Sequence, residues 1–143
     1  MNRSCIRSRF LCGAALVALA ASANAQVSGN AQANGYVQAN GNARKGEDVF
    51  TTNCGECHSA REGRDKRGPS LYGMVGATAG QKAGFKYSDD LAASGIVWDA
   101  ENLSRYLANP RALVPGSKMK FDGLANAQER ADVIAYIATL GAH

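Results

Sequence analysis

The sequence predicts an all-α fold in which short helices and irregular loops wrap around one bound group. Apolar residues recur at helical spacing in several stretches of residues 43–140, and no strand pattern surrounds Cys54 and Cys57. From Glu62 to Gly84 the chain is rich in glycine, at positions 63, 68, 73, 76, 80 and 84. This composition favours irregular loops over a strand or a long helix.

The first helix is expected over residues 43–54. Gly46, Phe50 and Cys54 lie four residues apart, so they share one face. A glycine inside a helix costs about 1 kcal/mol relative to alanine. Gly46 is therefore either a defect or the mark of a close helix crossing.

Two short helices are expected after the glycine-rich loops. Ser88 can N-cap one that runs through Ser94. Asp99 can cap the next, and Pro110 stops it at Asn109. The apolar stripe of this second helix consists of Leu103, Tyr106 and Leu107.

The last helix has the clearest pattern. Asn126 and Glu129 make a start that resembles a capping box, and Gly141 ends the helix. Its buried face is predicted to consist of Val133, Ile134, Tyr136, Ile137 and Leu140.

Cys54-Gly-Glu-Cys57-His58 is a C-x-x-C-H sequence, the attachment signature of a c-type haem. Two thiols at this spacing can form thioether bonds with the two vinyl groups on one edge of a porphyrin. The histidine that follows can then bind the iron through an imidazole nitrogen. The motif therefore predicts one covalently bound haem c, with His58 as an axial ligand.

Three other readings of the two cysteines are open: a disulfide, a thioredoxin-like redox pair and half of a zinc site. A zinc site needs about four ligands, and only His58 and His143 could join the thiols. A thioredoxin-like pair needs a βαβ context. Both requirements favour the haem.

Residues 1–25 are predicted to be a secretory signal peptide. Three arginines precede the apolar stretch 11–21, which is shorter than the roughly 20 residues of a membrane span. An Ala-x-Ala site at residues 23–25 predicts a mature chain that begins at Gln26 and retains only Cys54 and Cys57. In the alternative, residues 1–25 stay as a membrane anchor.

Residues 26–42 are polar and of low complexity, and we expect a flexible leader there. Residues 43–143 would then form the single folded domain. The formal charge of +4 includes the three arginines of residues 1–25; without them 13 basic and 12 acidic residues leave +1. This balance gives no electrostatic support for binding nucleic acid.

The candidates for the second iron ligand are Met74, Met119 and His143. His143 ends the chain after the helix-stopping Gly141, and Met74 lies among small apolar residues. Met119 follows a rigid Pro-Gly turn, and a loop can direct a thioether at iron. We therefore expect His58 and Met119 to be the two axial ligands.

The chain resembles a class I cytochrome c of the mitochondrial and alphaproteobacterial type from about residue 44 to residue 140. The resemblance rests on ordered motifs: Cys54-Gly-Glu-Cys-His58, Gly68-Pro69-Ser-Leu71-Tyr-Gly73, Gly84-Phe85-Lys-Tyr87-Ser88-Asp89, Gly95-Ile96-Val97-Trp98, Tyr106-Leu107-Ala-Asn109-Pro110, Pro115-Gly116-Ser117-Lys118-Met119 and Ala135-Tyr136.

The resemblance implies roles for further residues. Pro69 would abut His58 and help to fix the backbone-carbonyl partner of its ring. Tyr87 and Trp98 would donate hydrogen bonds to the inner haem propionate, because a buried carboxylate needs donors. The alternative for these two aromatic residues is ordinary core packing.

Other implied contacts lie farther along the chain. Tyr106 and Ser117 would lie near the Met119 sulfur. Gly46 and Phe50 would cross the C-terminal helix at Val133 and Tyr136. The chain departs from the family pattern at Ala77 and Leu91, and the main candidates for a basic ring around the haem edge are Arg111, Lys118 and Lys120.

The implied function is outer-sphere electron transfer, not enzyme catalysis, because a haem with His and Met ligands has no free coordination site. We expect a monomeric periplasmic carrier with an oxidase, reductase or photosynthetic complex as redox partner and no stable membrane insertion after signal cleavage. One alternative is a dedicated cytochrome subunit of a periplasmic dehydrogenase. Another is a gas-binding or peroxidase-like haem protein, which requires an open sixth position.

Overall fold

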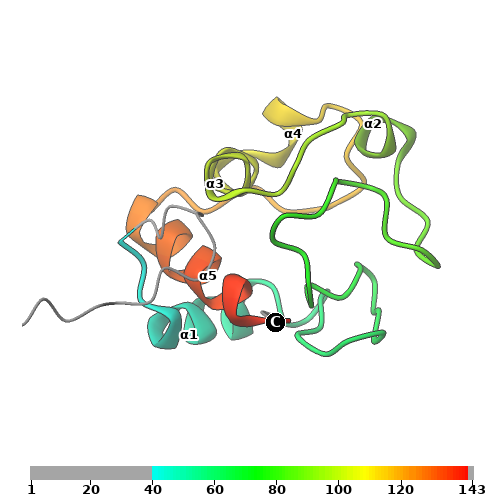
Figure 1. Cartoon of the computed structure of the whole chain (residues 1–143). Coiled ribbons are helices and arrows are strands. Elements are labelled where there is room, and N and C mark those ends of the chain that lie inside the picture. The colour runs from blue at the N-terminus through cyan, green and yellow to red at the C-terminus, as the bar shows by residue number, and fades with distance from the viewer. Residues whose placement is uncertain (1–39, 142–143) are drawn as a thin grey trace, which may run out of the picture. The chain divides into compact units, whose positions relative to one another are not determined.

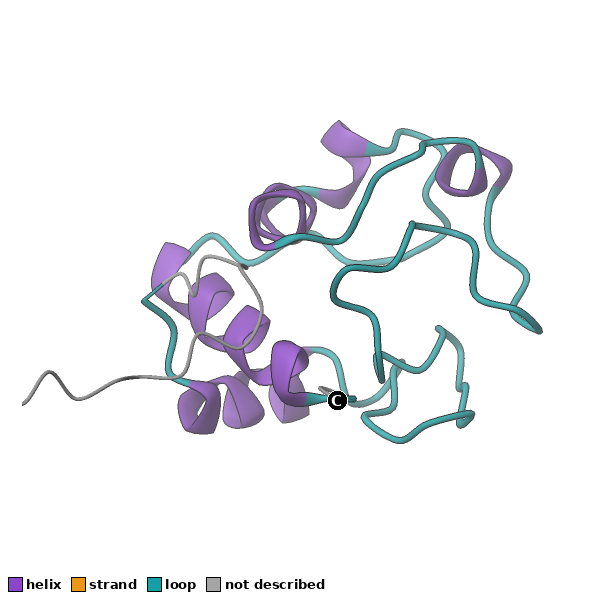
Figure 2. Ribbon diagram, in the orientation of Figure 1, coloured by secondary structure: helices purple, strands orange, loops and turns teal. Residues whose placement is uncertain are grey.

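A computed structural model describes residues 40–141 of the chain. The predicted signal peptide (1–25), most of the predicted leader and His143 lie outside the described residues. The helices are α1 (Ala43–Asn53), α2 (Asp89–Ala92), α3 (Ala100–Ala108), α4 (Pro110–Leu113) and α5 (Ala127–Thr139). Within residues 40–141 the rest is turn and loop, without a strand (Figures 1 and 2). No helix in this part is long and apolar enough to cross a membrane.

Side-chain caps begin the predicted helices. Ser88 accepts a hydrogen bond from the Leu91 amide, and Asp99 accepts one from the Asn102 amide. Asn126 accepts bonds from the amides of residues 128 and 129. The helix positions predicted from these capping residues are confirmed, with ends that differ by one or two residues.

Helix α4 was not expected. Pro110 ends α3, as predicted, but it also begins the next helix. The side chain of Asn109 accepts a hydrogen bond from the Ala112 amide, and Pro110 occupies the first turn of α4. A proline is compatible with that position because its missing N–H would have no partner inside the helix.

Helices α1 and α5 cross closely (Figure 1). A Cβ atom on Gly46 would lie 1.9 Å from the Asp132 carbonyl oxygen and 2.8 Å from Cβ of Tyr136. The rings of Phe50 and Tyr136 lie 5.4 Å apart. Of the two readings of Gly46, the close crossing is confirmed, because any side chain there would push the helices apart.

The segment before α1 also packs on α5. The Asn42 amide donates to Asp132 Oδ1 at 2.6 Å, and the Gln128 side chain bonds both that oxygen and the Asn40 carbonyl. These bonds lower the pKa of Asp132, and the bond from Asn42 has the largest effect. The side chain of Asp132 belongs to a residue that is only 4% exposed. The ordered contacts of the domain thus begin before residue 43.

The core lies between these helices, α3 and the loops. Its buried members are Phe50, Ala79, Trp98, Leu103, Tyr106, Leu107, Val114, Leu124, Val133, Ile134 and Ile137. Tyr136 and Leu140, which were also predicted for the buried face of the last helix, are half-buried.

The expected irregular loops fill residues 54–88. One part of them pairs with the segment that carries Trp98. The Gly76 amide donates to the Trp98 carbonyl at 3.0 Å, the Trp98 amide donates to Ala77 at 2.9 Å, and the Ala79 amide donates to Ile96 at 2.7 Å. This pairing fixes the backbone of Trp98 against the loop that follows Met74.

Candidate haem-binding site

Cys54 ends α1, and a tight turn follows it. The Cys57 amide donates to the Cys54 carbonyl at 3.0 Å, and the His58 amide donates to the same carbonyl at 2.8 Å. Both thiols are free and half-buried. Burial, and secondly the charge of Cys57, raises the pKa of Cys54 to about 11. One turn of chain thus brings together two thiols and an imidazole.

The His58 ring is held through one of its two nitrogens. Nδ1 lies 2.8 Å from the Pro69 carbonyl oxygen, so Nδ1 carries the proton and Nε2 keeps a free lone pair. Burial is the main cause that lowers the pKa of His58, and the positive charge of Lys66 adds to it. The imidazole is therefore neutral at pH 7, which is the form that binds a metal.

The segment before Pro69 leaves the ring little space. A Cβ atom on Gly68 would lie 2.3 Å from Cε1 and 2.7 Å from Nδ1 of His58. The Gly68 amide donates to the Cys57 carbonyl at 2.9 Å, which ties this backbone to the attachment turn. Only a glycine at position 68 lets the chain pass so close to the ligand ring.

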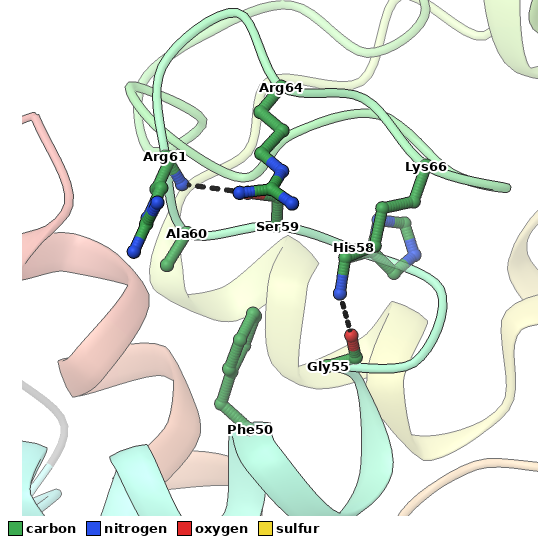
Figure 3. A pocket seen from close by; sticks show the side chains of 8 residues that line it. All are labelled: Phe50, Gly55, His58, Ser59, Ala60, Arg61, Arg64 and Lys66. Atoms are coloured by element: carbon green, nitrogen blue, oxygen red, sulfur yellow. Dashed lines mark hydrogen bonds between the residues drawn. The ribbon is translucent and has the colours of Figure 1, made fainter.

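A hollow of about 250 Å³ adjoins His58 (Figure 3). Phe50 projects into it from α1 toward Ala60, and Lys66 donates a hydrogen bond to the Gly55 carbonyl in the attachment turn. The hollow covers only the histidine side of the expected site, because its lining consists of Phe50, Gly55, His58, Ser59, Ala60, Arg61, Arg64 and Lys66.

The segment that carries Met119 is held by a chain of side-chain bonds. The Tyr106 hydroxyl and Ser117 Oγ lie 2.9 Å apart, and Ser117 Oγ accepts a bond from the Met119 amide at 3.3 Å. Burial raises the pKa of Tyr106, and the bond with Ser117 opposes this shift. Tyr106 and Ser117 are thus joined to the backbone of Met119. Their position near the Met119 sulfur, which the resemblance implies, stays a prediction.

Met119 and Met74 are both half-buried and both pack against the core. Burial alone therefore does not distinguish the two candidate ligands. The third candidate, His143, lies outside the described residues. The difference between the methionines is in their backbone: Met119 stands on a segment fixed by side chains of α3 and α2, whereas the Met74 amide makes a local turn bond to Leu71.

The two aromatic residues expected near a propionate lie in different surroundings. Trp98 is buried, and its ring lies 5.0 Å from that of Tyr106. Tyr87 is half-buried, with its ring 4.9 Å from Phe85. Burial, and secondly the negative charge of Asp65, raises the pKa of Tyr87, so its hydroxyl stays a hydrogen-bond donor at neutral pH.

The donor set fits a covalently attached haem. It offers two free thiols, an imidazole that is bonded to Pro69 through Nδ1 and keeps Nε2 for a metal, and a thioether on a loop that side chains hold in place. The zinc alternative finds no support, since residues 40–141 contain no cluster of three or more His, Cys, Asp or Glu side chains arranged for a metal. A βαβ context for a redox pair is also absent from this part of the chain.

These features define a small helical domain with one attachment turn for haem. The comparisons with known proteins agree: residues 43–141 match the model of the cytochrome c family. Cytochrome c of Euglena viridis is 42% identical over 99 residues, which are 69% of this chain and 97% of that protein. Cytochrome c2 of Rhodopila globiformis is 46% identical over 96 residues (67% and 91%). Cytochrome c2 iso-2 of Magnetospirillum fulvum is 49% identical over 87 residues (61% and 91%).

The chain therefore belongs to the cytochrome c family. It has the class I cytochrome c fold and carries one covalently bound haem c, and its general function is electron transfer through that single haem.

Three residues with a place in this site were not singled out from the sequence. Gly68 was expected only as one of the loop glycines, and the available signal for its role was its place directly before Pro69. Lys66 and Asp90 gave no signal, because their partners are backbone groups 11 and 26 residues away. Contacts of that kind depend on the fold and not on a local pattern.

Proposed function

We propose that this protein is a periplasmic electron carrier that moves single electrons between redox partners of a respiratory or photosynthetic chain. The observation that carries the proposal is the orientation of His58, whose Nδ1 is bonded to Pro69 while Nε2 remains for the iron. A second ligand at Met119 would close the remaining position, which leaves electron transfer as the available chemistry.

In this proposal Cys54 and Cys57 hold the haem covalently, and His58 and Met119 are its axial ligands. Pro69 fixes the ring of His58, while Tyr106 and Ser117 fix the segment of Met119. When bound, the haem supplies one-electron redox chemistry, and a thioether ligand favours its reduced form. The protein's part is to keep the ligands in place in both oxidation states.

Tyr87 and Trp98 complete the proposed site as donors to a propionate. Both can donate at neutral pH: Tyr87 because its pKa is raised, and Trp98 because an indole N–H does not titrate. Two contacts support this role. The Trp98 backbone pairs with Gly76 and Ala77 in the loop after Met74. The Tyr87 carbonyl accepts a hydrogen bond from Lys118 in the Met119 segment.

The proposed location rests on residues 1–25, whose basic start, short apolar stretch and Ala-x-Ala site are typical of a secretory signal. The mature protein is expected to begin at Gln26, and intact mass, which detects this start whether or not the glutamine has cyclised, or Edman sequencing checks it. Full-length protein in the membrane fraction would instead support a retained anchor. Tight co-purification with one dehydrogenase would replace the diffusing carrier by the dedicated-subunit alternative.

The ligand assignment is tested with Met119→Ala and its matched control Met74→Ala, both methionines being half-buried against the core. The oxidised wild-type protein is expected to show a weak near-infrared sulfur-to-iron band, which Met119→Ala loses and Met74→Ala keeps. The reverse pattern would move the ligand to Met74. Haem that is extracted by acid acetone from the wild type would contradict covalent attachment through Cys54 and Cys57.

A further inference from the structure

Helix α2 is joined to the segment before Met119 by a carboxylate. The amide of Gly116 donates to Oδ2 of Asp90 at 2.8 Å, across 26 residues of sequence. Asp90 lies in the first turn of α2, where Ser88 caps the helix and fixes the start of the turn. Figure 1 shows the chain after α4 passing beside α2.

The contact depends on a glycine at position 116. A Cβ atom there would lie 2.3 Å from Oδ2 and 2.4 Å from Cγ of Asp90. The carboxylate therefore occupies the space that any other residue at position 116 would fill. A second bond joins the Met119 segment to the residues just before α2: Lys118 Nζ donates to the Tyr87 carbonyl at 3.3 Å.

The Met119 segment is thus held from two directions. On one side Ser117 is bonded to Tyr106 of α3, and on the other side Gly116 is bonded to Asp90 of α2. The Asp90 bond has an ionised acceptor, which makes it stronger than a bond between neutral groups, although its exposure to solvent weakens it. Without it, the side of the segment that faces α2 keeps only the exposed bond from Lys118 to the Tyr87 carbonyl.

We infer that Asp90 is a positioning residue for Met119: its carboxylate keeps the segment 115–119 in the conformation that presents the thioether, without touching the haem. The inference rests on the proposed ligation by Met119. In this inference α2 restrains the exchange of Met119 for an external ligand. The helix has only four residues and lies in an otherwise irregular region.

The test uses the haem-loaded, oxidised full-length mature protein and cyanide as the probe. Cyanide can occupy the Met119 position only when the segment opens, so its binding rate reports that opening. Asp90→Ala is expected to bind cyanide about three- to tenfold faster than wild type. Asp90→Asn keeps an oxygen acceptor and is expected to fall between the two.

Asp89→Ala is the matched control, because Asp89 shares the first turn of α2 and the same charge but does not bond Gly116. Its cyanide rate is expected to stay within about twofold of wild type. Hydrogen exchange gives a second readout: the Gly116 amide is expected to exchange faster in Asp90→Ala, while amides in the centre of α5 do not change.

Equal cyanide rates in Asp90→Ala and Asp89→Ala would overturn the inference, provided that Met119→Ala binds cyanide much faster than either. A Met119→Ala protein that binds cyanide as slowly as wild type would overturn the ligand assignment, and the role of Asp90 with it. The two failures are therefore distinguishable in one set of measurements.

Discussion

The segments that carry His58 and Met119 are held in different ways. His58 stands in a loop whose bonds are short in sequence: its ring bonds Pro69, and the Gly68 amide bonds Cys57, so neither contact spans more than about a dozen residues. The Met119 segment is held mainly by side chains of two helices: Tyr106 of α3, 11 residues from its partner Ser117, and Asp90 of α2, 26 residues from its partner Gly116. A locally closed loop resists opening, whereas a segment held by a few exposed or half-buried side chains can open without disturbing the core.

The largest expected effect comes from replacing one glycine with alanine near each proposed ligand, Gly68 beside His58 and Gly116 in the segment of Met119. In Gly68→Ala the new Cβ meets the His58 ring, which the bond to Pro69 prevents from moving aside. In Gly116→Ala the new Cβ meets the end of the exposed Asp90 side chain, which can swing into solvent. We expect Gly68→Ala to lose about 2–3 kcal/mol of unfolding free energy, or to yield little holoprotein, and Gly116→Ala to lose less than about 1 kcal/mol.

Denaturant unfolding of the two haem-loaded variants, followed at the haem absorbance, measures this difference. Gly116→Ala also provides the control for glycine replacement as such, since neither glycine has a positive φ that would add strain of its own. Equal losses in the two variants would show that the His58 side is no more rigid than the Met119 side.

Native-state hydrogen exchange compares the two sides without mutation. The amides of Gly68 and Leu71 bond the carbonyls of Cys57 and Ser59 within the His58 loop. The Met119 amide bonds only the half-buried Ser117 hydroxyl among the described contacts. We expect the Met119 amide to exchange at least about tenfold faster, a difference of about 1.4 kcal/mol in opening free energy. Similar rates at both places would contradict the comparison.

A smaller effect is expected from Lys66, which bridges its own loop to the attachment turn through the Gly55 carbonyl. Lys66→Gln is expected to lower the unfolding free energy by about 0.5–1 kcal/mol, since the bond is exposed. It is also expected to lower the midpoint potential, because a cation near the iron disfavours the oxidised form.

Arg67→Gln is the control for this change. Arg67 lies one residue away, and its ion pair with Glu56 at 3.1 Å is exposed on both sides (76% and 80%). Such a pair contributes at most about 1 kcal/mol and often nothing measurable. If Arg67→Gln shifted the potential as much as Lys66→Gln, general surface charge, and not the position of the Lys66 cation beside the attachment turn, would be the cause.

The same difference explains how far the sequence was informative. The attachment site could be predicted from Cys54, Cys57 and His58, because its chemistry is contained in five consecutive residues. The contact of Pro69 with His58 spans 11 residues and was expected only from the family resemblance. The caps at Ser88, Asp99 and Asn126 are local signals too, and they placed the helices correctly. Helix α4 and the contacts of Asp90 were missed, since a proline reads as a stop and a surface carboxylate gives no indication of a partner 26 residues away.

The smallest expected effect concerns the charges that steer a redox partner. Arg111, Lys118 and Lys120 are exposed around the Met119 segment, and we expect them to form a positive rim for an acidic partner. Because Lys118 also bonds the Tyr87 carbonyl, Arg111→Glu/Lys120→Glu separates charge from structure. This double variant is expected to slow bimolecular electron transfer to that partner about threefold at low ionic strength, and less at physiological salt, where the Debye length is about 8 Å. Stopped-flow kinetics measures both rates.

The matched control, Arg61→Glu/Arg64→Glu, makes the same charge change on the His58 side. An equal slowing there would mean that net charge, and not a rim at the Met119 side, steers the encounter.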